Sequence, residues 1–210
     1  MARAPSPVAV SVMNEIQKRQ GAYLPHWTKE GGTYFVTFRT ADSLPVEAVN
    51  ELKSEARLLK NKSDWVALTP DEVARAGRLN SEQYERLLDN AFGACVLRHA
   101  ECAKLVADAL LYYAESQYRL WAWCVMPNHV HAVVRPHADV SLSAIVHGWK
   151  SVSSRRIGKV LGSGGVLWQA EYYDHLIRDE TEFQHFVRYT LKNPATAGLI
   201  DWEWVGAFDP

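Results

Sequence analysis

Three segments of the chain have the residue pattern of β-strands. Residues 33–40 are rich in β-branched and aromatic residues and follow a Gly-Gly turn signal. Residues 118–125 and 129–134 have the same character and are separated only by 126–128, Met-Pro-Asn, in which Pro followed by Asn favours a turn. The pattern therefore predicts one early strand and a β-hairpin in the middle of the chain.

Apolar residues recur every three or four positions in other segments. The clearest helical periods cover 94–116, 142–161 and 179–193, the last of which ends before a proline. Weaker helical patterns, rich in charged residues, cover 46–60 and 70–91. Within 142–161 the apolar residues share one stripe and the basic residues lie elsewhere, which predicts an amphipathic helix with a basic outer surface.

Strands that alternate with helices around a central hairpin are typical of layered folds in which helices cover one face of a mainly antiparallel sheet. We therefore expect an α+β fold with a ferredoxin-like antiparallel sheet. A chain of 210 residues has room for one substantial core. We expect a flexible arm over 1–23, this domain over 24–200, a helical elaboration around 43–93 and an irregular tail over 201–210.

Composition narrows the function that such a domain can have. The formal net charge of −1 argues against indiscriminate nucleic-acid binding, which requires many Lys and Arg, so any DNA site must be a local patch. Cys95, Cys102 and Cys124 have no spacing typical of disulfide frameworks or zinc sites. No apolar run reaches the roughly 18 to 20 residues of a membrane span, and no signal-peptide pattern is present, so we expect a soluble cytoplasmic protein.

The second strand of the predicted hairpin contains the sequence His129-Val-His131. Strand alternation directs these two imidazoles to one face of the sheet and Val130 to the other. Imidazole is a common ligand of transition metals, and two histidines on one face can share a cation. The alternative is that both histidines simply lie on a half-exposed sheet face, and the His-x-His pattern alone does not separate the two.

The last predicted helix places polar residues on a second face. Phe183, Phe186, Val187 and Leu191 form its apolar stripe, whereas His185, Tyr189 and Asn193 recur every four residues along another face. Tyr189 is therefore not an obvious core residue. The alternatives are a boundary tyrosine and an asparagine that ends the helix before proline.

The segment 123–134, WCVMPNHVHAVV, resembles the metal-binding hairpin of the HUH endonuclease superfamily, and more narrowly that of REP-associated tyrosine transposases. Residues 24–39 resemble the opening strand of this family, and residues 167–199 resemble its closing half, including a Tyr-x-x-x-Asn-Pro string. The resemblance covers most of residues 24–200.

The resemblance implies an enzyme that nicks and rejoins single-stranded DNA at repeat-type hairpins. It implies that Tyr189 is the nucleophile and that His129, His131 and Asn193 hold a divalent cation, Mg²⁺ or Mn²⁺. The tyrosine would become linked to a 5′ phosphate, so that the bond energy is retained for rejoining. The resemblance also favours a monomer slightly over a homodimer. His185 or a lysine could help to activate the tyrosine, and the sequence leaves this open.

The predicted basic helix and the aromatic residues after it are candidates for DNA contact. Basic side chains can follow the phosphate backbone, and aromatic rings can stack on unpaired bases. The alternative is a solvated helix face with core aromatics. Tyr172 and Tyr173 also compete with Tyr189 as nucleophiles, but they lie in an extended segment. The residues expected to bind DNA are Lys150, Ser154, Arg155, Arg156, Lys159, Trp168 and Tyr172.

Two other functions fit the same residues. One is a DNA hairpin-binding protein that has the fold but does not cut. The other is a metal-dependent phosphodiesterase that uses water as its nucleophile, for which Tyr189 would be dispensable. The low net charge keeps both alternatives open.

Overall fold

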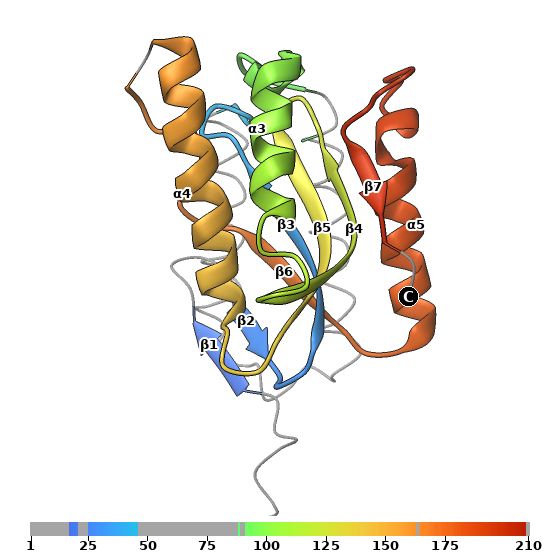
Figure 1. The fold of residues 1–210 in the computed structure, drawn as a ribbon. Helices are drawn as coiled ribbons and strands as arrows, with labels where there is room; N and C mark the ends of the chain where they lie inside the picture. Colours follow the sequence, from blue (N-terminus) through green and yellow to red (C-terminus); the bar gives the residue numbers. More distant parts are fainter. Residues whose placement is uncertain (1–16, 21–24, 46–87, 89–90, 163, 209–210) are drawn as a thin grey trace, which may run out of the picture.

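A five-stranded antiparallel sheet with strand order β6-β3-β5-β4-β7 is the centre of the fold (Figure 1). The computed structural model describes residues 17–20, 25–45, 88, 91–162 and 164–208. The strands of the sheet are β3 (Thr33–Arg39), β4 (Tyr118–Val125), β5 (His129–Pro136), β6 (Tyr173–Ile177) and β7 (Val205–Ala207). A separate hairpin pairs β1 (Gln17–Gln20) with β2 (Pro25–Thr28). This hairpin begins within the stretch 1–23, where an arm is expected.

Helices and strands alternate along the chain in the order β3-α3-β4-β5-α4-β6, which is the ferredoxin-like arrangement. The helices are η2 (Val96–Arg98), α3 (Ala100–Leu111), α4 (Leu142–Leu161) and α5 (Glu180–Thr196). The α+β fold class and the predicted central hairpin are therefore confirmed. The helices predicted over 46–60 and 70–91 lie outside the described residues, apart from Leu88 in the second of them.

Local chemistry explains the ends of the long helices. The Ser141 hydroxyl accepts a hydrogen bond from the Ala144 amide at the start of α4, and Gly162 adopts a left-handed conformation at its end, with φ of 62°. At the start of α5 the Asp179 carboxylate accepts from the Glu182 amide at 2.9 Å. The predicted end of this helix was wrong, because α5 continues through Pro194 to Thr196.

Two further predictions about secondary structure were wrong. The helix expected over 94–116 is shorter, because Cys95 has a left-handed backbone and His99 an extended one, so η2 is separated from α3. The tail contains strand β7, which pairs with β4 at the edge of the sheet.

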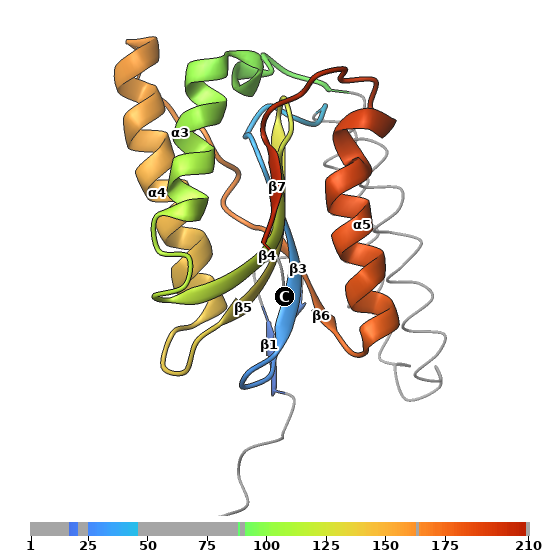
Figure 2. The same cartoon turned by 45° about the vertical axis from the view of Figure 1, so that its right-hand side comes forward.

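Helices cover both faces of the sheet, whereas only one covered face was expected. Figure 2 shows α3 and α4 on one side of the sheet and α5 on the other. The reason is that both faces of the central strands are apolar. Val36 and Phe38 of β3 belong to the core against α3 and α4, whereas Phe35 of the same strand belongs to a smaller cluster against α5.

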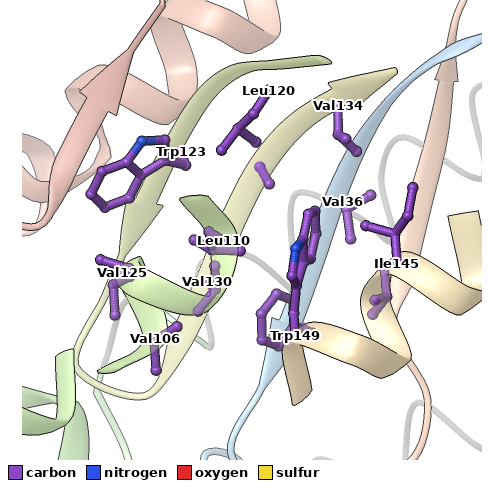
Figure 3. Close-up of a cluster of buried hydrophobic side chains, with 14 of the residues drawn as sticks. Val36, Val106, Leu110, Leu120, Trp123, Val125, Val130, Val134, Ile145 and Trp149 are labelled. Carbon is purple, nitrogen blue, oxygen red and sulfur yellow. The ribbon is translucent and has the colours of Figure 1, made fainter. Parts of the chain in front are cut away.

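The core between the sheet and the α3–α4 layer is the larger of the two (Figure 3). It is built from apolar residues of β3, β4 and β5 together with Leu110 of α3 and Trp149 of α4. Its polar atoms are paired, since the Trp149 indole donates to the Tyr118 hydroxyl at 2.8 Å, and that hydroxyl donates to the Leu110 carbonyl at 2.7 Å. This core holds the hairpin that carries the two histidines.

Candidate active site

The side chains of His129 and His131 lie on the α5 side of the sheet, as the strand alternation predicts. Val130 belongs to the core on the other side. Both imidazoles are buried, with exposed fractions of 1% and 0%, and their Nε2 atoms are 3.0 Å apart. Two ligands about 2.1 Å from an octahedral ion, in adjacent positions, also lie about 3 Å apart. The separation of the two nitrogens therefore suits a shared cation.

Asn128 determines which nitrogen of His129 carries the proton. Its amide nitrogen donates to the Phe92 carbonyl at 3.0 Å, so its Oδ1 atom faces His129 Nδ1 at 2.8 Å. Because this oxygen can only accept, Nδ1 must be the protonated nitrogen, and Nε2 keeps its lone pair. Sequence reasoning treated Asn128 as a turn residue and missed this role.

Thr37 of β3 contacts the second histidine in the same way. Its hydroxyl lies 2.9 Å from His131 Nδ1, and the two residues are directly opposite each other in the ladder between β3 and β5. A hydroxyl can either donate or accept, so Thr37 suits either tautomer of His131. Partners of this kind orient metal-binding histidines in many proteins. The sequence offered no signal for Thr37, because it lies 94 residues from its partner.

Burial keeps both imidazoles neutral. It lowers the pKa of His129 to about 3. Burial is also the main cause that holds the pKa of His131 well below its ordinary value of 6.5, and the charge of His129 adds to it. Neutral imidazole is the form that binds metal ions. The site is therefore in the ligand form at neutral pH.

Helix α5 brings the predicted nucleophile to the histidines. The Tyr189 ring lies 5.4 Å from the His131 ring, centroid to centroid, at an interplanar angle of 73°. It also contacts Phe35 edge-on at 5.7 Å. His185, one turn earlier, lies 6.5 Å from the Tyr189 ring in a stacked orientation and is exposed.

Asn193, one turn after Tyr189, is almost completely buried, with an exposed fraction of 3%. Its Oδ1 atom has no hydrogen-bond partner among the described residues. A buried amide oxygen without a partner is costly, unless a ligand or an ion completes it. Within the part of the chain that the structure describes, no three His, Cys, Asp or Glu side chains gather around a metal position. The residues present fit a cation held by two imidazoles and one amide oxygen.

The competing tyrosines have different surroundings. Tyr172 packs against the His26 ring at 4.9 Å, which places it near β2. Tyr173 lies directly opposite Thr37 in the ladder between β3 and β6 and belongs to the cluster under α5. Tyr173 is therefore the tyrosine to compare with Tyr189 in any test of the nucleophile.

The residues expected to bind DNA are not gathered at this site. Helix α4 packs on the face opposite the histidines, and its exposed cations Arg155, Arg156 and Lys159 point away from the sheet. The indole of Trp168 is buried, contacts Phe38 and donates to the Ser153 hydroxyl at 3.0 Å. Trp168 is thus a core residue in this structure and offers no face to a base.

Lys150 and Ser154 are half-buried residues of the same helix. The Lys150 ammonium donates to the carbonyls of Gln169 and Ala170, so it ties α4 to the segment before β6. Burial lowers the pKa of Lys150, and the Glu171 carboxylate offsets part of this effect. DNA binding by the α4 surface stays a prediction.

Polar residues within 167–199, the segment that resembles the closing half of the transposase family, hold β6 in place. Asp174 forms a buried hydrogen-bonded pair with His26 of β2. On the other side of the strand, His175 and Arg178 both contact the Glu182 carboxylate in the first turn of α5. These contacts connect β6 to β2 and to α5, and so orient the helix that carries Tyr189.

Comparison with known proteins agrees with this geometry. Residues 99–191 match the family described as "Transposase IS200 like", a stretch that contains His129, His131 and Tyr189. Over these residues the chain is similar to IS200-like transposases. The REP-associated tyrosine transposase of Escherichia coli K12 is 27% identical over 90 residues, which cover 40% of this chain and 52% of that protein.

A second relative, from Haemophilus influenzae, whose description also names a REP-associated tyrosine transposase, is 25% identical over 99 residues. These cover 40% of this chain and 55% of that protein. The match thus spans about half the length of both relatives. A solved structure titled as a REP-associated tyrosine transposase bound to a REP hairpin has a TM-score of 0.50 at 16% identity. It covers 90% of this chain and 82% of that one, which shows a shared fold.

No described helix of the chain combines the length and the apolar character that crossing a bilayer requires.

Proposed function

We propose that the protein is a metal-dependent endonuclease and transposase that nicks and rejoins single-stranded DNA at repeat-type hairpins. The observation that carries the proposal is the convergence of His129, His131 and Tyr189, together with the buried oxygen of Asn193 on the same helix as the tyrosine. The match of residues 99–191 to the IS200-like family and a fold shared with a hairpin-bound transposase support it.

Each side chain has a distinct task in this proposal. His129, His131 and Asn193 hold a divalent cation, Mg²⁺ or Mn²⁺, that neutralises charge on the phosphate of the cleaved bond. The Tyr189 oxygen forms a bond to phosphorus, and the bond from phosphorus to the 3′ oxygen of the preceding sugar breaks. The phenol proton is released to a base, and the departing oxygen takes up a proton and becomes a 3′ hydroxyl. The 5′ phosphate stays on the tyrosine until rejoining.

We also propose that the protein acts as a monomer in the cytoplasm. All four side chains of the proposed site come from one chain, which supports the monomer. Light scattering coupled to size exclusion, with and without hairpin DNA, tests the monomer.

The proposal is tested by incubating the protein with single-stranded hairpin DNA from the repeats that flank its own gene. We expect a protein–DNA adduct that survives denaturation, that requires Mg²⁺ or Mn²⁺, and that is lost in Tyr189→Phe. Tyr173→Phe is the matched control, because it removes the same hydroxyl from the neighbouring strand and should keep the adduct.

The other outcomes separate the remaining functions. An adduct of unchanged yield in Tyr189→Phe would assign the nucleophile to another residue. Hairpin binding by the wild-type protein without cleavage in either metal would favour a binding protein. Cleavage without any adduct, and at a normal rate in Tyr189→Phe, would favour a water-using phosphodiesterase.

A further inference from the structure

Two arginines face each other at the end of the sheet that lies farthest from the β4–β5 turn. Arg119 of β4 and Arg135 of β5 are directly opposite in the antiparallel ladder. Like charges in such a pair repel and destabilise a sheet. Both side chains lie on the α5 side, because Arg135 is four residues from His131 on the same face of β5.

The side chain of Trp121 lies beneath both guanidinium groups. The Cζ atom of Arg119 is 4.8 Å from the centroid of its ring, and that of Arg135 is 6.0 Å from it. The other edge of the ring contacts Phe183 of α5 at 5.4 Å. An arginine held on an aromatic face keeps the N–H groups along its edge available, and these match the geometry of phosphate oxygens.

The two arginines differ in their contacts with the described side chains around them. Arg119 forms an ion pair of 3.3 Å with Glu115, but both partners are partly exposed, which makes such pairs weak. Arg135 is exposed and donates to the Thr33 hydroxyl at 3.0 Å. Within the described residues, no carboxylate lies at ion-pair distance from Arg135. The exposed guanidinium of Arg135 is therefore open to an anionic ligand.

The position of the two arginines relative to the histidines suits a DNA stem. Six residues of β5 separate His129 from Arg135, which is about 20 Å at about 3.3 Å per residue. A duplex of about six base pairs spans the same length at about 3.4 Å per step. The exposed cations of α4, in contrast, belong to a helix on the opposite face of the sheet (Figure 2).

We propose that Arg119 and Arg135, supported by the Trp121 ring, bind the phosphate backbone of the stem of the hairpin whose foot is cleaved at Tyr189. This inference rests on the proposed function, since it takes the hairpin as the ligand and His129 and His131 as the cleavage site. The name phosphate clamp is used below for Arg119, Trp121 and Arg135.

The test measures hairpin affinity by fluorescence anisotropy over a range of salt concentrations. It uses the full chain and two hairpins with the same foot, one with a stem of about three base pairs and one with about ten. The test variant carries Arg119→Gln and Arg135→Gln. The matched control carries Arg98→Gln and Lys104→Gln, which remove two exposed charges from η2 and α3, outside every site proposed for DNA. Thermal unfolding of every variant checks that the fold is retained.

We expect the clamp variant to bind the long-stem hairpin several-fold more weakly, with a salt slope reduced by about two. Its affinity for the short-stem hairpin and its adduct yield on that hairpin should be unchanged, and the variant with Arg98→Gln and Lys104→Gln should bind both hairpins normally. A variant with Arg119→Lys and Arg135→Lys should recover most of the salt slope, because it keeps both charges. That variant also provides the test if the glutamine variant fails to fold.

Several results would overturn the clamp. These are no loss of affinity, equal losses for the two stems, or a loss in the Arg98→Gln and Lys104→Gln control that matches or exceeds that of the clamp variant. Wild-type protein that binds neither hairpin would overturn both the clamp and the proposed function. Wild-type protein that prefers the long stem, with this preference dependent on Arg119 and Arg135, but forms no adduct would contradict the proposed cleavage alone.

Discussion

The two faces of the central sheet bury different kinds of groups. The face against α3 and α4 is a continuous apolar core, and the polar atoms of Tyr118 and Trp149 within it are paired. The face against α5 has a small apolar centre of Phe35, Ala122 and Val133. The two imidazoles lie at one end of that centre, and the phosphate clamp lies at the other.

Unpaired polar groups are also concentrated on the second face. Buried atoms without a hydrogen-bond partner in the described structure include Oδ1 of Asn193, Oγ1 of Thr190 and Nε1 of Trp121, and all three residues belong to α5 or face it. Such groups reduce stability unless a ligand satisfies them. One face therefore supplies the stability of the fold, and the other keeps buried polar groups that the proposed metal ion and DNA would satisfy.

The largest effect is expected from removing a histidine. His131→Ala should lower the adduct yield by more than about a hundredfold. Loss of a residue that only supports a metal ligand costs up to about a hundredfold, and loss of the ligand itself should cost more. The free energy of unfolding should fall less than in a variant of the large core, because the desolvation of the buried imidazole offsets part of its packing. Adduct yield and urea unfolding measure the two effects. A loss of stability with normal adduct yield would reverse the assignment of the two faces.

The second effect concerns the opposite face. Leu110→Ala in α3 should lower the free energy of unfolding by about 2–5 kcal/mol, because the side chain is fully buried in the large core. Adduct yield per folded molecule should stay at the wild-type level. Urea unfolding and active-site titration of the same sample provide both numbers. A folded Leu110→Ala protein that no longer cuts would mean that the two faces are strongly coupled.

A third, smaller effect is expected at Thr37. Thr37→Val keeps the shape of the side chain but removes the hydroxyl that contacts His131, so Mn²⁺ affinity should fall by about 10–100-fold. Thr37→Ser should restore most of it. Thr190→Val is the matched control, because its hydroxyl is buried on α5 without a partner. Calorimetric titration with Mn²⁺ alone measures the affinity, and equal losses in both valine variants would exclude a specific role for Thr37.

The smallest effect is the anchoring of α5 by Glu182. Burial alone would raise the pKa of Glu182, but hydrogen bonds from Arg178 and His175 outweigh it and lower the pKa to about 2. A lowered pKa stabilises the fold at pH values above the ordinary value of 4.5, and this contribution is lost as the pH falls from 4.5 towards 2.

The Glu182→Gln variant should therefore lose part of this acid sensitivity. Because Arg178 is half exposed, the difference at neutral pH should be about 1 kcal/mol or less. Urea unfolding between neutral pH and pH 3 checks this, with Glu180→Gln in the same turn as the control. Identical pH profiles for wild type and Glu182→Gln would exclude the anchor.

Sequence reasoning predicted the elements whose signals are local. The hairpin followed from apolar runs on both sides of Pro127-Asn128, and the bounds of α4 followed from its apolar stripe and the glycines after it. The common face of His129 and His131 needed only strand alternation. The spacing of Tyr189 and Asn193 on one helix was equally accessible.

Features that depend on distant pairing could not be predicted. Strand β7 has only three residues, too few for a periodic pattern, and is formed by pairing with β4. Trp168 was expected at the DNA surface, but its burial depends on Phe38 and Ser153, far from it in sequence. The contact between Thr37 and His131 depends on the register of β3 against β5.

In the ladder between β4 and β5, one residue of β4 has no partner on β5. Leu120 faces Val134 and Ala122 faces Val133, so Trp121 is a bulge with no partner on β5. A chain lacking only Trp121 could pair Leu120 and Ala122 in an unbroken ladder, with Cys124 still opposite His131. In evolutionary terms the tryptophan behaves as an insertion that pairing does not require. Among homologues, its presence should therefore follow the presence of the two arginines rather than that of the histidines.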